Sequence, residues 1–316
     1  MQRVALIYNP ASGQHSDKRK AAIEDALAVL TDAGIAAEAL VTVGVGSATI
    51  LAGEAMAKGC DTIIACGGDG TVHEILQAMV GSDVALGVIP LGTANALAAN
   101  LGLNASPAKA VRKLLDAVPA RVSLGRIHFR DKAGNDHSRY FTVAAGVGAD
   151  ALLMSRLDSG LKRRLGYVLY LIEAFRIWAT HSFPLFEVVL PASGESGERV
   201  VEVSQLLVVR VRSFGGVLRY LAPGASLRSG NLSLLAFKTQ SRFRYMLFLL
   251  AVIVGVHKFE REVELVETTS VECRPRNGSD EELFVEADGE VLGLLPVRIE
   301  VVPHSLNLLV PLHAQP

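Results

Sequence analysis

The sequence predicts an α/β domain with a parallel sheet, followed by a second domain that is an antiparallel β-sandwich. Up to about residue 120, short apolar runs alternate with segments that have helical apolar spacing, a pattern typical of βαβ units covered on both faces. After Pro119, short apolar or alternating runs separated by turn residues dominate, as in antiparallel sandwiches. The chain has 316 residues, more than one core ordinarily fills, which also favours two domains.

The elements of the first domain follow from this alternation. We expect strands near residues 3–8, 35–42, 61–66 and 84–89, and helices near residues 17–33, 47–57, 71–80, 93–100 and 106–117. The third of these helices is expected to begin at Thr71, because threonine is a good N-cap and Glu74 three residues later completes a capping box.

The second domain is predicted to contain mainly short strands, with two helical interruptions. The strands are expected at 121–129, 140–145, 186–190, 199–203, 205–211, 232–237, 263–266, 270–274, 283–286 and 297–302. The helices are expected at 161–178 and 241–257. We therefore assign residues 1–120 to the α/β domain, 121–296 to the sandwich and 297–316 to terminal strands.

The segment Gly67-Gly68-Asp69-Gly70-Thr71 is the most informative feature of the chain. It stands between an apolar run at 62–66 and the predicted helix that starts at Thr71. Glycine allows backbone N–H groups to approach a ligand closely. A helix N-terminus with free N–H groups and a positive dipole end suits an anion such as phosphate.

Two further loops resemble this one in composition and position. Pro90-Leu91-Gly92-Thr93-Ala94-Asn95 follows the apolar run 84–89, and Asn9-Pro10-Ala11-Ser12-Gly13 follows the run 3–8. Parallel strands deliver the loops at their carboxyl ends to one edge of the sheet, where open α/β folds bind ligands. Together the three loops predict a cradle for nucleotide phosphates.

Phosphoryl transfer in such a cradle requires specific side chains. The chain contains no Gly-x4-Gly-Lys-Ser/Thr segment, so a kinase of this sequence is not of the P-loop type. Asp69 is the expected acidic partner of Mg²⁺, through water, because Mg²⁺ prefers hard oxygen ligands and keeps several waters. Thr93 and Asn95 are expected to hydrogen-bond phosphate or ribose. Thr71 either does the same or only caps its helix.

Bulk properties exclude some classes of function. The formal net charge is −1, which argues against a nucleic-acid binder. The three cysteines have neither zinc nor redox spacing and are expected to be reduced core thiols. No signal peptide is visible, so we expect a cytoplasmic protein. No pattern indicates an oligomeric state.

Two segments bear on contact with a membrane. The apolar stretch 245–256 is shorter than the roughly twenty residues of a spanning helix, and we interpret it as a buried helix that borders a lipid site. The segment 155–164 combines Arg156, Lys162, Arg163 and Arg164 with leucines. This favours either an anionic membrane surface or a solvated helix start. Peripheral contact with the inner membrane face is therefore one expectation.

The motifs and their order resemble the diacylglycerol kinase catalytic-domain family, which includes bacterial lipid kinases related to sphingosine and ceramide kinases. The resemblance covers nearly the whole chain. Besides the three loops, it rests on Gly166-Tyr167, Phe214-Gly215-Gly216, Ala222-Pro223-Gly224-Ala225 and Asp288-Gly289-Glu290.

This resemblance implies an ATP-dependent kinase that acts on a lipid hydroxyl, with an NAD kinase-like or diacylglycerol kinase-like first domain. The phosphate-binding residues are then Asn9, Ser12, Gly13, Gly67, Gly68, Asp69, Gly70, Thr71, Gly92, Thr93 and Asn95. Taken alone, Asp-Gly favours a hairpin turn. The resemblance instead makes Asp288 the base that takes the hydroxyl proton, assisted by Glu290. It also implies that Asp288 faces the glycine turns across the gap between two lobes, and that strand 306–310 returns to the first domain.

The chain departs from the family pattern at three acidic positions. Many relatives carry aspartate where this chain has Ala96, Ser123 and the Arg228-Ser229 pair. These departures put an auxiliary water–magnesium network or structural metal site in doubt, and leave Asp69 and Asp288 intact.

Two other classes of function share part of this pattern. NAD kinases contain the Gly-Gly-Asp-Gly-Thr loop but also a downstream Asn-Glu pair, and phosphofructokinases contain Thr-Ile-Asp; this chain has neither segment. A soluble kinase of the NAD type remains the first alternative. The second is a nucleotide- or lipid-binding homologue without turnover, suggested by the missing acids.

Overall fold

The structure is a computed structural model that describes most of the chain. The described residues are 1–10, 16–103, 106–131, 133–156, 167–192, 197–212, 222, 224–254, 262–278, 281–312 and 314. They form two compact units, which we call the first and second units. The first unit comprises Met1–Leu124 and Pro303–Pro316, and the second comprises Gly125–Val302.

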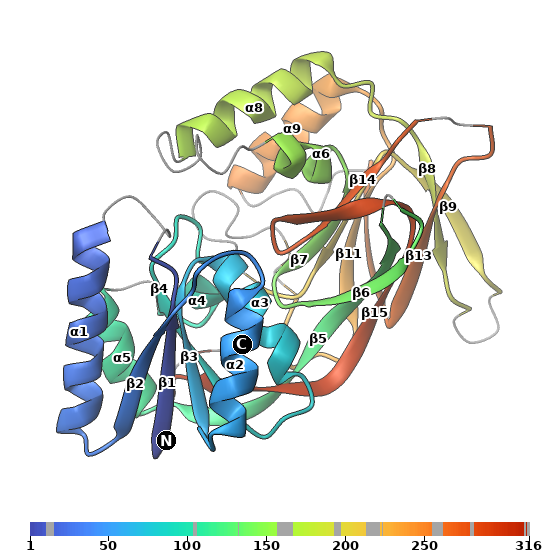
Figure 1. The fold of residues 1–316 in the computed structure, drawn as a ribbon. Helices are drawn as coiled ribbons and strands as arrows, with labels where there is room; N and C mark the ends of the chain where they lie inside the picture. Colours follow the sequence, from blue (N-terminus) through green and yellow to red (C-terminus); the bar gives the residue numbers. More distant parts are fainter. Residues whose placement is uncertain are drawn as a thin grey trace. The chain divides into compact units, whose positions relative to one another are not determined.

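The sheet of the first unit is parallel, with the strand order β2–β1–β3–β4–β15 (Figure 1). Its strands are β1 (Arg3–Tyr8), β2 (Ala36–Val41), β3 (Thr62–Gly67), β4 (Ala85–Pro90) and the last part of β15 (Glu290–Val310). Every residue of β3 is buried, as expected for a strand with both faces covered. The predicted parallel α/β domain is confirmed.

Helices cover this sheet on both faces. They are α1 (Ser16–Asp32), α2 (Ser47–Ala57), α3 (Asp69–Met79), α4 (Ala96–Asn100) and α5 (Pro107–Leu115). Helix α1 packs with α5, and α2 packs with α3 (Figure 1). Two predicted helix starts are wrong, because α3 begins before Thr71 and α4 begins after residue 93.

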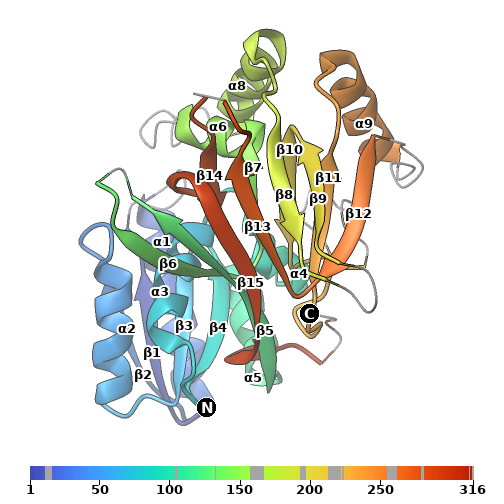
Figure 2. The ribbon, with the colours of Figure 1, turned by 90° about the vertical axis from the view of Figure 1, so that its right-hand side faces the viewer.

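The second unit contains antiparallel strands (Figure 2). They surround one apolar core. One row of hydrogen-bonded strands has the order β14–β7–β10–β11–β12, and the other row has the order β13–β8–β9. The first part of β15 pairs with both β14 and β13. Strand β6 pairs with β5. Buried side chains from both rows, such as Val208 and Val188, belong to the same core cluster. The predicted antiparallel sandwich is confirmed.

The bounds of these strands are close to those expected from the sequence. They are β5 (Val118–Arg130), β6 (Asp136–Phe141), β7 (Ala144–Gly148), β8 (Phe186–Leu190), β9 (Arg199–Val203), β10 (Gln205–Val209), β11 (Leu232–Phe237), β12 (Val263–Thr268), β13 (Ser270–Pro275) and β14 (Phe284–Ala287). The single strand predicted at 140–145 is wrong, because β6 ends at Phe141 and β7 begins at Ala144. The backbone between them donates hydrogen bonds to the carboxylate of Asp288 instead.

The described helices of the second unit are α6 (Ala149–Arg156), α8 (Tyr167–Thr180) and α9 (Arg242–Val254). Helix α6 was not predicted. The sequence predicts that helix α9 is buried, and this is correct for one of its faces, where Tyr245 and Phe248 pack against Phe237 of β11. The opposite face of α9 is not buried, since Phe243 on that face is 70% exposed. None of the described helices is long and apolar enough to cross a bilayer.

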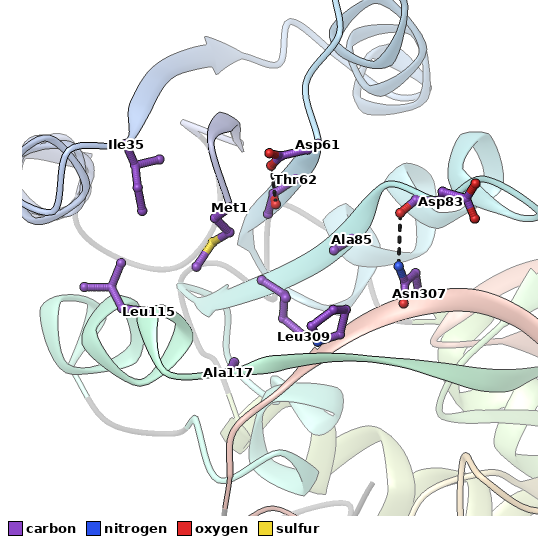
Figure 3. A pocket seen from close by; sticks show the side chains of 11 residues that line it. Met1, Ile35, Asp61, Thr62, Asp83, Ala85, Leu115, Ala117, Asn307 and Leu309 are labelled. Carbon is purple, nitrogen blue, oxygen red and sulfur yellow. Dashed lines mark hydrogen bonds between the residues drawn. The ribbon is translucent and has the colours of Figure 1, made fainter.

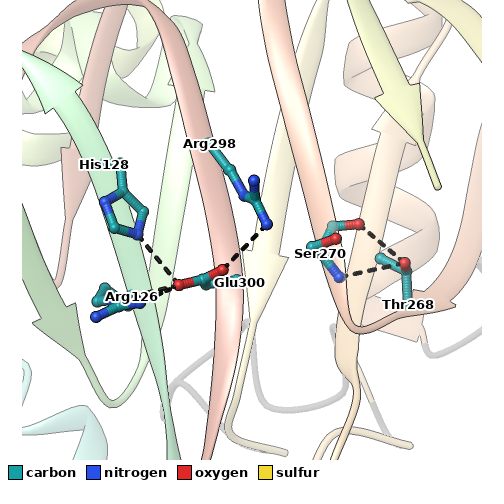
Figure 4. A network of polar contacts seen from close by, with 6 residues as sticks. All are labelled: Arg126, His128, Thr268, Ser270, Arg298 and Glu300. Carbon is teal, nitrogen blue, oxygen red and sulfur yellow. Dashed lines mark hydrogen bonds and ion pairs between the residues drawn. The ribbon is translucent and has the colours of Figure 1, made fainter.

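An ion-pair network lies on the β5 and β15 strands of the second unit (Figure 4). The carboxylate of Glu300 accepts hydrogen bonds from Arg126 (Nε, 3.0 Å) and Arg298 (Nη2, 3.4 Å), and it contacts the ring nitrogen Nε2 of His128 at 3.1 Å. The hydrogen bonds from Arg126 are the main cause that lowers the pKa of Glu300. Two arginines and a histidine around one carboxylate join neighbouring strands on this face.

Candidate functional site

The glycine loop after β3 leads directly into α3. Gly68 is the N-cap residue, and its carbonyl oxygen accepts hydrogen bonds from Thr71 N–H (3.0 Å) and Val72 N–H (3.2 Å). The helix therefore begins at Asp69, and the first backbone N–H groups of α3 belong to the glycine loop itself. Such N–H groups have no carbonyl acceptor within their own helix and suit an anionic ligand.

The predicted capping box of Thr71 and Glu74 is wrong. Thr71 is buried in the first turn of α3 and covers Gly67, where an added Cβ would lie 2.3 Å from the Thr71 hydroxyl oxygen. Glu74 instead accepts a hydrogen bond from Ala48 N–H of α2 (3.2 Å). Thr71 thus fills space beneath the loop, and its predicted role as N-cap passes to Gly68.

The loop after β4 is closed by the side chain of Asn95. Its Oδ1 accepts a hydrogen bond from Gly92 N–H (2.9 Å), and its Nδ2 donates to the Gly92 carbonyl (2.8 Å). Asn95 has a φ of 51°, in the left-handed region that asparagine tolerates, and α4 begins at the next residue. Thr93 is exposed at the tip of this turn. Asn95 therefore shapes the loop, while Thr93 presents its hydroxyl to solvent.

The two loops contact each other through their backbones. An added Cβ on Gly92 would lie 2.4 Å from the Cα of Gly68, so glycine is required for this close approach. The Asp69 carboxylate accepts a hydrogen bond from Ala96 N–H at the start of α4 (2.8 Å). Leu91 N–H donates to the Gly67 carbonyl (2.9 Å). The ends of β3 and β4 thus form one continuous surface of backbone and short polar side chains.

The third predicted loop begins beside the end of β3. Asn9 N–H donates to the Cys66 carbonyl at 3.4 Å, so Asn9 lies at the same edge of the sheet as the glycine loop. Ser12 and Gly13 lie outside the described residues. The structure therefore brings Asn9, Gly67–Thr71 and Gly92–Asn95 to one edge.

Asp69 is the residue predicted to bind magnesium. One of its oxygens caps α4, and the residues that the structure describes contain no cluster of three or more His, Cys, Asp or Glu side chains suited to a metal. Mg²⁺ in phosphoryl-transfer sites is commonly held by one or two carboxylates together with the substrate phosphates and water. A single carboxylate beside the glycine loop is compatible with that mode, in which Mg²⁺ would arrive with the nucleotide.

A pocket of about 290 Å³ lies elsewhere in the first unit (Figure 3). It is lined by Thr62 and Ala85, the first residues of β3 and β4, together with Met1, Leu115 and Leu309. None of the predicted phosphate-binding residues lines it. It is at the amino ends of strands whose carboxyl ends carry the glycine loops, and so it is separate from the candidate site.

In the second unit, Asp288 and Gly289 form the two-residue turn between β14 and β15. Both have positive φ angles, 50° and 84°, as in the turns that favour Asp-Gly in tight hairpins. The expectation of a hairpin is therefore correct. Glu290, the first residue of β15, is exposed, and Asp288 is half-buried.

The carboxylate of Asp288 is held by donors from the segment between β6 and β7. Its Oδ2 accepts hydrogen bonds from Thr142 N–H (2.9 Å) and the Thr142 hydroxyl (3.2 Å). Its Oδ1 accepts hydrogen bonds from Val143 N–H (2.8 Å) and Ala144 N–H (3.1 Å). These bonds explain why the strand predicted at 140–145 is interrupted. They also fix the position of the carboxylate.

Two further acidic residues lie beside this turn and were missed by the sequence reasoning. Glu286, on β14, is 3% exposed and accepts a hydrogen bond from Gly289 N–H through Oε2 (2.7 Å). Asp150, in the first turn of α6, forms a hydrogen bond with Glu286. The only sequence signal was the position of Glu286 next to the Asp-Gly turn. Ordinary strand patterning would direct its side chain to solvent.

Two family models match the chain. Residues 3–127 match the diacylglycerol kinase catalytic domain, and residues 142–310 match the YegS C-terminal NAD kinase beta sandwich-like domain.

Similar proteins were found over the full length of the chain. The diacylglycerol kinase of Mycobacterium tuberculosis is 31% identical, with 98% of this chain and 96% of the relative covered. A probable lipid kinase YegS-like of Chromohalobacter salexigens is 31% identical, with 97% and 92% covered. A crystal structure of a putative diacylglycerol kinase from Bacillus anthracis superposes with a TM-score of 0.76 at 22% identity, covering 99% of this chain and 96% of that one. At this identity, the structural likeness concerns the fold.

Proposed function

Because this chain belongs to the diacylglycerol kinase catalytic-domain family, we propose that it is an ATP-dependent lipid kinase. It transfers the γ-phosphoryl group of ATP to a hydroxyl of a lipid such as diacylglycerol or a sphingoid or ceramide-like lipid. The observation that carries the proposal is the close contact of the two glycine loops at the ends of β3 and β4, where the Cα of Gly68 and the backbone of Gly92 meet. This surface and the N-terminus of α3 suit a chain of phosphates.

Each loop has a role in the proposed site. The backbone of residues 67–70 binds the triphosphate, and Thr93 and Asn9 add hydrogen bonds to phosphate or ribose. Asp69 holds Mg²⁺ through water, and the bound ion would neutralise charge on the phosphates. The Asp69 hydrogen bond to α4 couples the metal-binding carboxylate to the second loop. Ser12 and Gly13 are proposed to complete the cradle.

In the proposed reaction, a bond forms between the lipid oxygen and the γ-phosphorus, and the bond from that phosphorus to the β–γ bridging oxygen breaks. The proton of the lipid hydroxyl passes to a carboxylate oxygen of Asp288, with Glu290 as an assisting carboxylate. The Asp288 oxygens already accept four hydrogen bonds, so one of these bonds must break before the lipid hydroxyl can donate to the carboxylate. The longest, 3.2 Å from the Thr142 hydroxyl, is the first candidate.

The acceptor test uses γ-labelled ATP, Mg²⁺ and either a total lipid extract or NAD. Label in the organic phase is the expected result. Label on NAD would replace the proposal with a soluble kinase of the NAD type. Nucleotide binding without product from either acceptor would identify a binding homologue without turnover.

The test of the base compares Asp288→Asn with Thr142→Val. Asp288→Asn should lower turnover about 10²–10⁴-fold while ATP binding persists. Thr142→Val removes only the hydroxyl donor and leaves the carboxylate in place, so it should retain most of the activity. Wild-type turnover in Asp288→Asn would exclude Asp288 as the base.

We also propose peripheral contact of the second unit with the cytoplasmic face of the membrane, through one face of α9 and one of α8. On α9, Phe243, Leu247 and Leu250 recur with helical spacing and are 42–70% exposed. On α8, Phe175 is 62% exposed, and Trp178 Nε1–H donates to the Arg242 carbonyl (2.8 Å), which joins the ends of the two helices. Exposed apolar side chains on helices that also carry exposed arginines suit an anionic bilayer.

Sedimentation with phosphatidylglycerol vesicles tests this contact. The double variant Phe243→Ser with Leu247→Ser should weaken vesicle binding. The matched control is Val43→Ser with Val45→Ser in the first unit, which removes two even more exposed apolar side chains, 93% and 101% exposed. Equal vesicle binding by both double variants would exclude the α9 face. Turnover with a short-chain, water-soluble diacylglycerol should be retained in either case.

A further inference from the structure

Two acidic side chains from distant parts of the sequence meet beneath the Asp-Gly-Glu turn. Glu286 lies directly opposite Gly146 in the pairing of β14 with β7, and Asp150 follows β7 on α6. An added Cβ on Gly146 would lie 2.7 Å from Asp150 Oδ2 and 2.9 Å from Glu286 Oε1. Both carboxyl groups therefore occupy the space that a side chain at position 146 would fill.

Glu286 also contacts the turn through its second oxygen. Oε2 accepts the Gly289 N–H at 2.7 Å, and Oε1 is the oxygen on the Asp150 side. Gly289 is adjacent to Asp288, whose carboxylate is anchored to residues 142–144. The turn is consequently held at two points, at Asp288 through its carboxylate and at Gly289 through its backbone.

A hydrogen bond between two carboxyl groups requires a proton on one of them, because ionised carboxylates only accept. The surroundings of Glu286 favour retention of that proton. Burial, the charge of Asp150 and the charge of Asp288 all raise the pKa of Glu286 well above its ordinary value, while the Gly289 N–H lowers it. Burial raises the pKa of Asp150 to about 6, and the hydrogen bond with Glu286 acts in the opposite direction. Strand β7 carries no titratable side chain, and Glu290 and Arg156 on the flanking elements are exposed.

We propose that Asp150 and Glu286 share one proton and that this protonated pair is the positioning element of the Asp-Gly-Glu turn. Around neutral pH, Glu286 Oε1 carries the proton and donates it to Asp150 Oδ2, and Oε2 receives the Gly289 N–H. Loss of the proton at higher pH places two negative charges side by side in a buried site. Their repulsion displaces Glu286, the Gly289 N–H loses its acceptor, and the turn that carries Asp288 shifts.

The effect on stability has a defined sign. A carboxyl group whose folded pKa is raised binds its proton more tightly in the folded state, so its contribution is fully present below the ordinary carboxyl pKa of about 4.5. That contribution is lost as pH rises through the folded pKa. Unfolding experiments should therefore show a loss of stability above about pH 4.5 that depends on Glu286 and Asp150.

Conservative variants separate the shared proton from simple packing. In Glu286→Gln, the amide N–H₂ donates to Asp150 and the amide oxygen accepts from Gly289, which mimics the protonated form at every pH. Asp150→Asn likewise leaves one charge in the pair. Glu286→Ala removes both contacts. The matched control is Glu282→Gln, which neutralises an exposed carboxylate four residues earlier.

The shared proton is tested directly by carbon-13 NMR titration of the carboxyl groups, compared with the pH dependence of urea unfolding. Neither readout requires turnover, so the inference can fail or hold separately from the lipid-kinase proposal on which its functional part rests. We expect a Glu286 signal that stays protonated through neutral pH. The stability loss should disappear in Glu286→Gln and persist in Glu282→Gln. A Glu286 signal that titrates with exposed glutamates would overturn the proposal.

The positioning role is tested by the pH profile of turnover with lipid. Glu286→Ala should lower turnover about a hundredfold through misplacement of the turn. Glu286→Gln should restore it and extend activity to higher pH. If Glu286→Gln is as inactive as Glu286→Ala, or if its alkaline limb matches wild type, the pair does not position the turn.

Discussion

The contact between the two glycine loops can be tested by a single methyl group. In Gly92→Ala, the new Cβ would lie 2.4 Å from the Cα of Gly68 and 2.9 Å from Asn95 Oδ1. Carbon atoms in contact are normally about 3.5–4.0 Å apart, so the loops must separate by more than about 1 Å. The atom in the way belongs to the backbone, which cannot rotate aside as a flexible side chain would.

The expected loss of stability combines two contributions. Overpacking of this kind costs about 1–3 kcal/mol, and the two hydrogen bonds between Asn95 and Gly92 contribute about 1 kcal/mol each when they are disrupted. We therefore expect Gly92→Ala to lower the free energy of unfolding by about 3–5 kcal/mol when both hydrogen bonds are lost. Urea unfolding followed by far-UV circular dichroism measures this change.

The local readout is amide hydrogen exchange of residues 85–100, which should become faster, together with a weaker affinity for ATP. The matched control is Gly53→Ala in the interior of α2, where an added Cβ meets nothing within 4 Å. That substitution should stabilise the protein by up to about 1 kcal/mol, because alanine is the better helix former. A Gly92→Ala protein with wild-type stability and wild-type ATP affinity would show that the loops do not need this close approach.

Two further predictions concern charged side chains. Asp69→Asn preserves an oxygen that accepts the Ala96 N–H, so its free energy of unfolding should stay within about 0.5 kcal/mol of wild type, while its Mg²⁺-dependent turnover falls. Asp69→Ala removes this acceptor, so it should lower the free energy of unfolding by a further ~1 kcal/mol. Equal unfolding curves for the two variants would contradict the capping role. The lowered pKa of Glu300 contributes stability that is present above its ordinary value of 4.5 and is lost as pH falls through the folded value. Glu300→Gln should therefore flatten the acid limb of urea unfolding and cost up to about 1 kcal/mol at neutral pH, and an unchanged acid limb would count against the network.

The sequence was most informative where local pattern and tertiary environment agree. Strand β3 was predictable because an uninterrupted apolar run suits a strand buried on both faces. The start of α3 was not, because capping preference is local, whereas Thr71 is held inward by its packing over Gly67. Likewise, the composition of the Gly92–Asn95 loop was recognisable, but the use of the Asn95 amide to close that loop depends on a left-handed backbone that no residue type dictates.

The acidic pair of the second unit could not be predicted from the sequence for a different reason. Asp150 and Glu286 lie far apart in the sequence. Considered separately, Asp150 is an ordinary polar residue near a helix start, and Glu286 is an ordinary polar residue within a strand. Only the pairing of β7 with β14 brings them together opposite a glycine. Asp288 was recognised by its motif, whereas three of the four donors that anchor it are backbone N–H groups, which carry no sequence signature.

The discontinuous make-up of the first unit has a consequence for biosynthesis. Residues 1–124 leave the ribosome first, yet β4 acquires its β15 neighbour only when Asn307 and Leu308 have been translated. Until then an apolar parallel strand presents an open edge, which is a template for association with other nascent chains. A stop codon ahead of the codons for Asn307 and Leu308 would thus damage the unit that residues 1–124 begin, and folding of the first unit can finish only after this part of β15 has been translated.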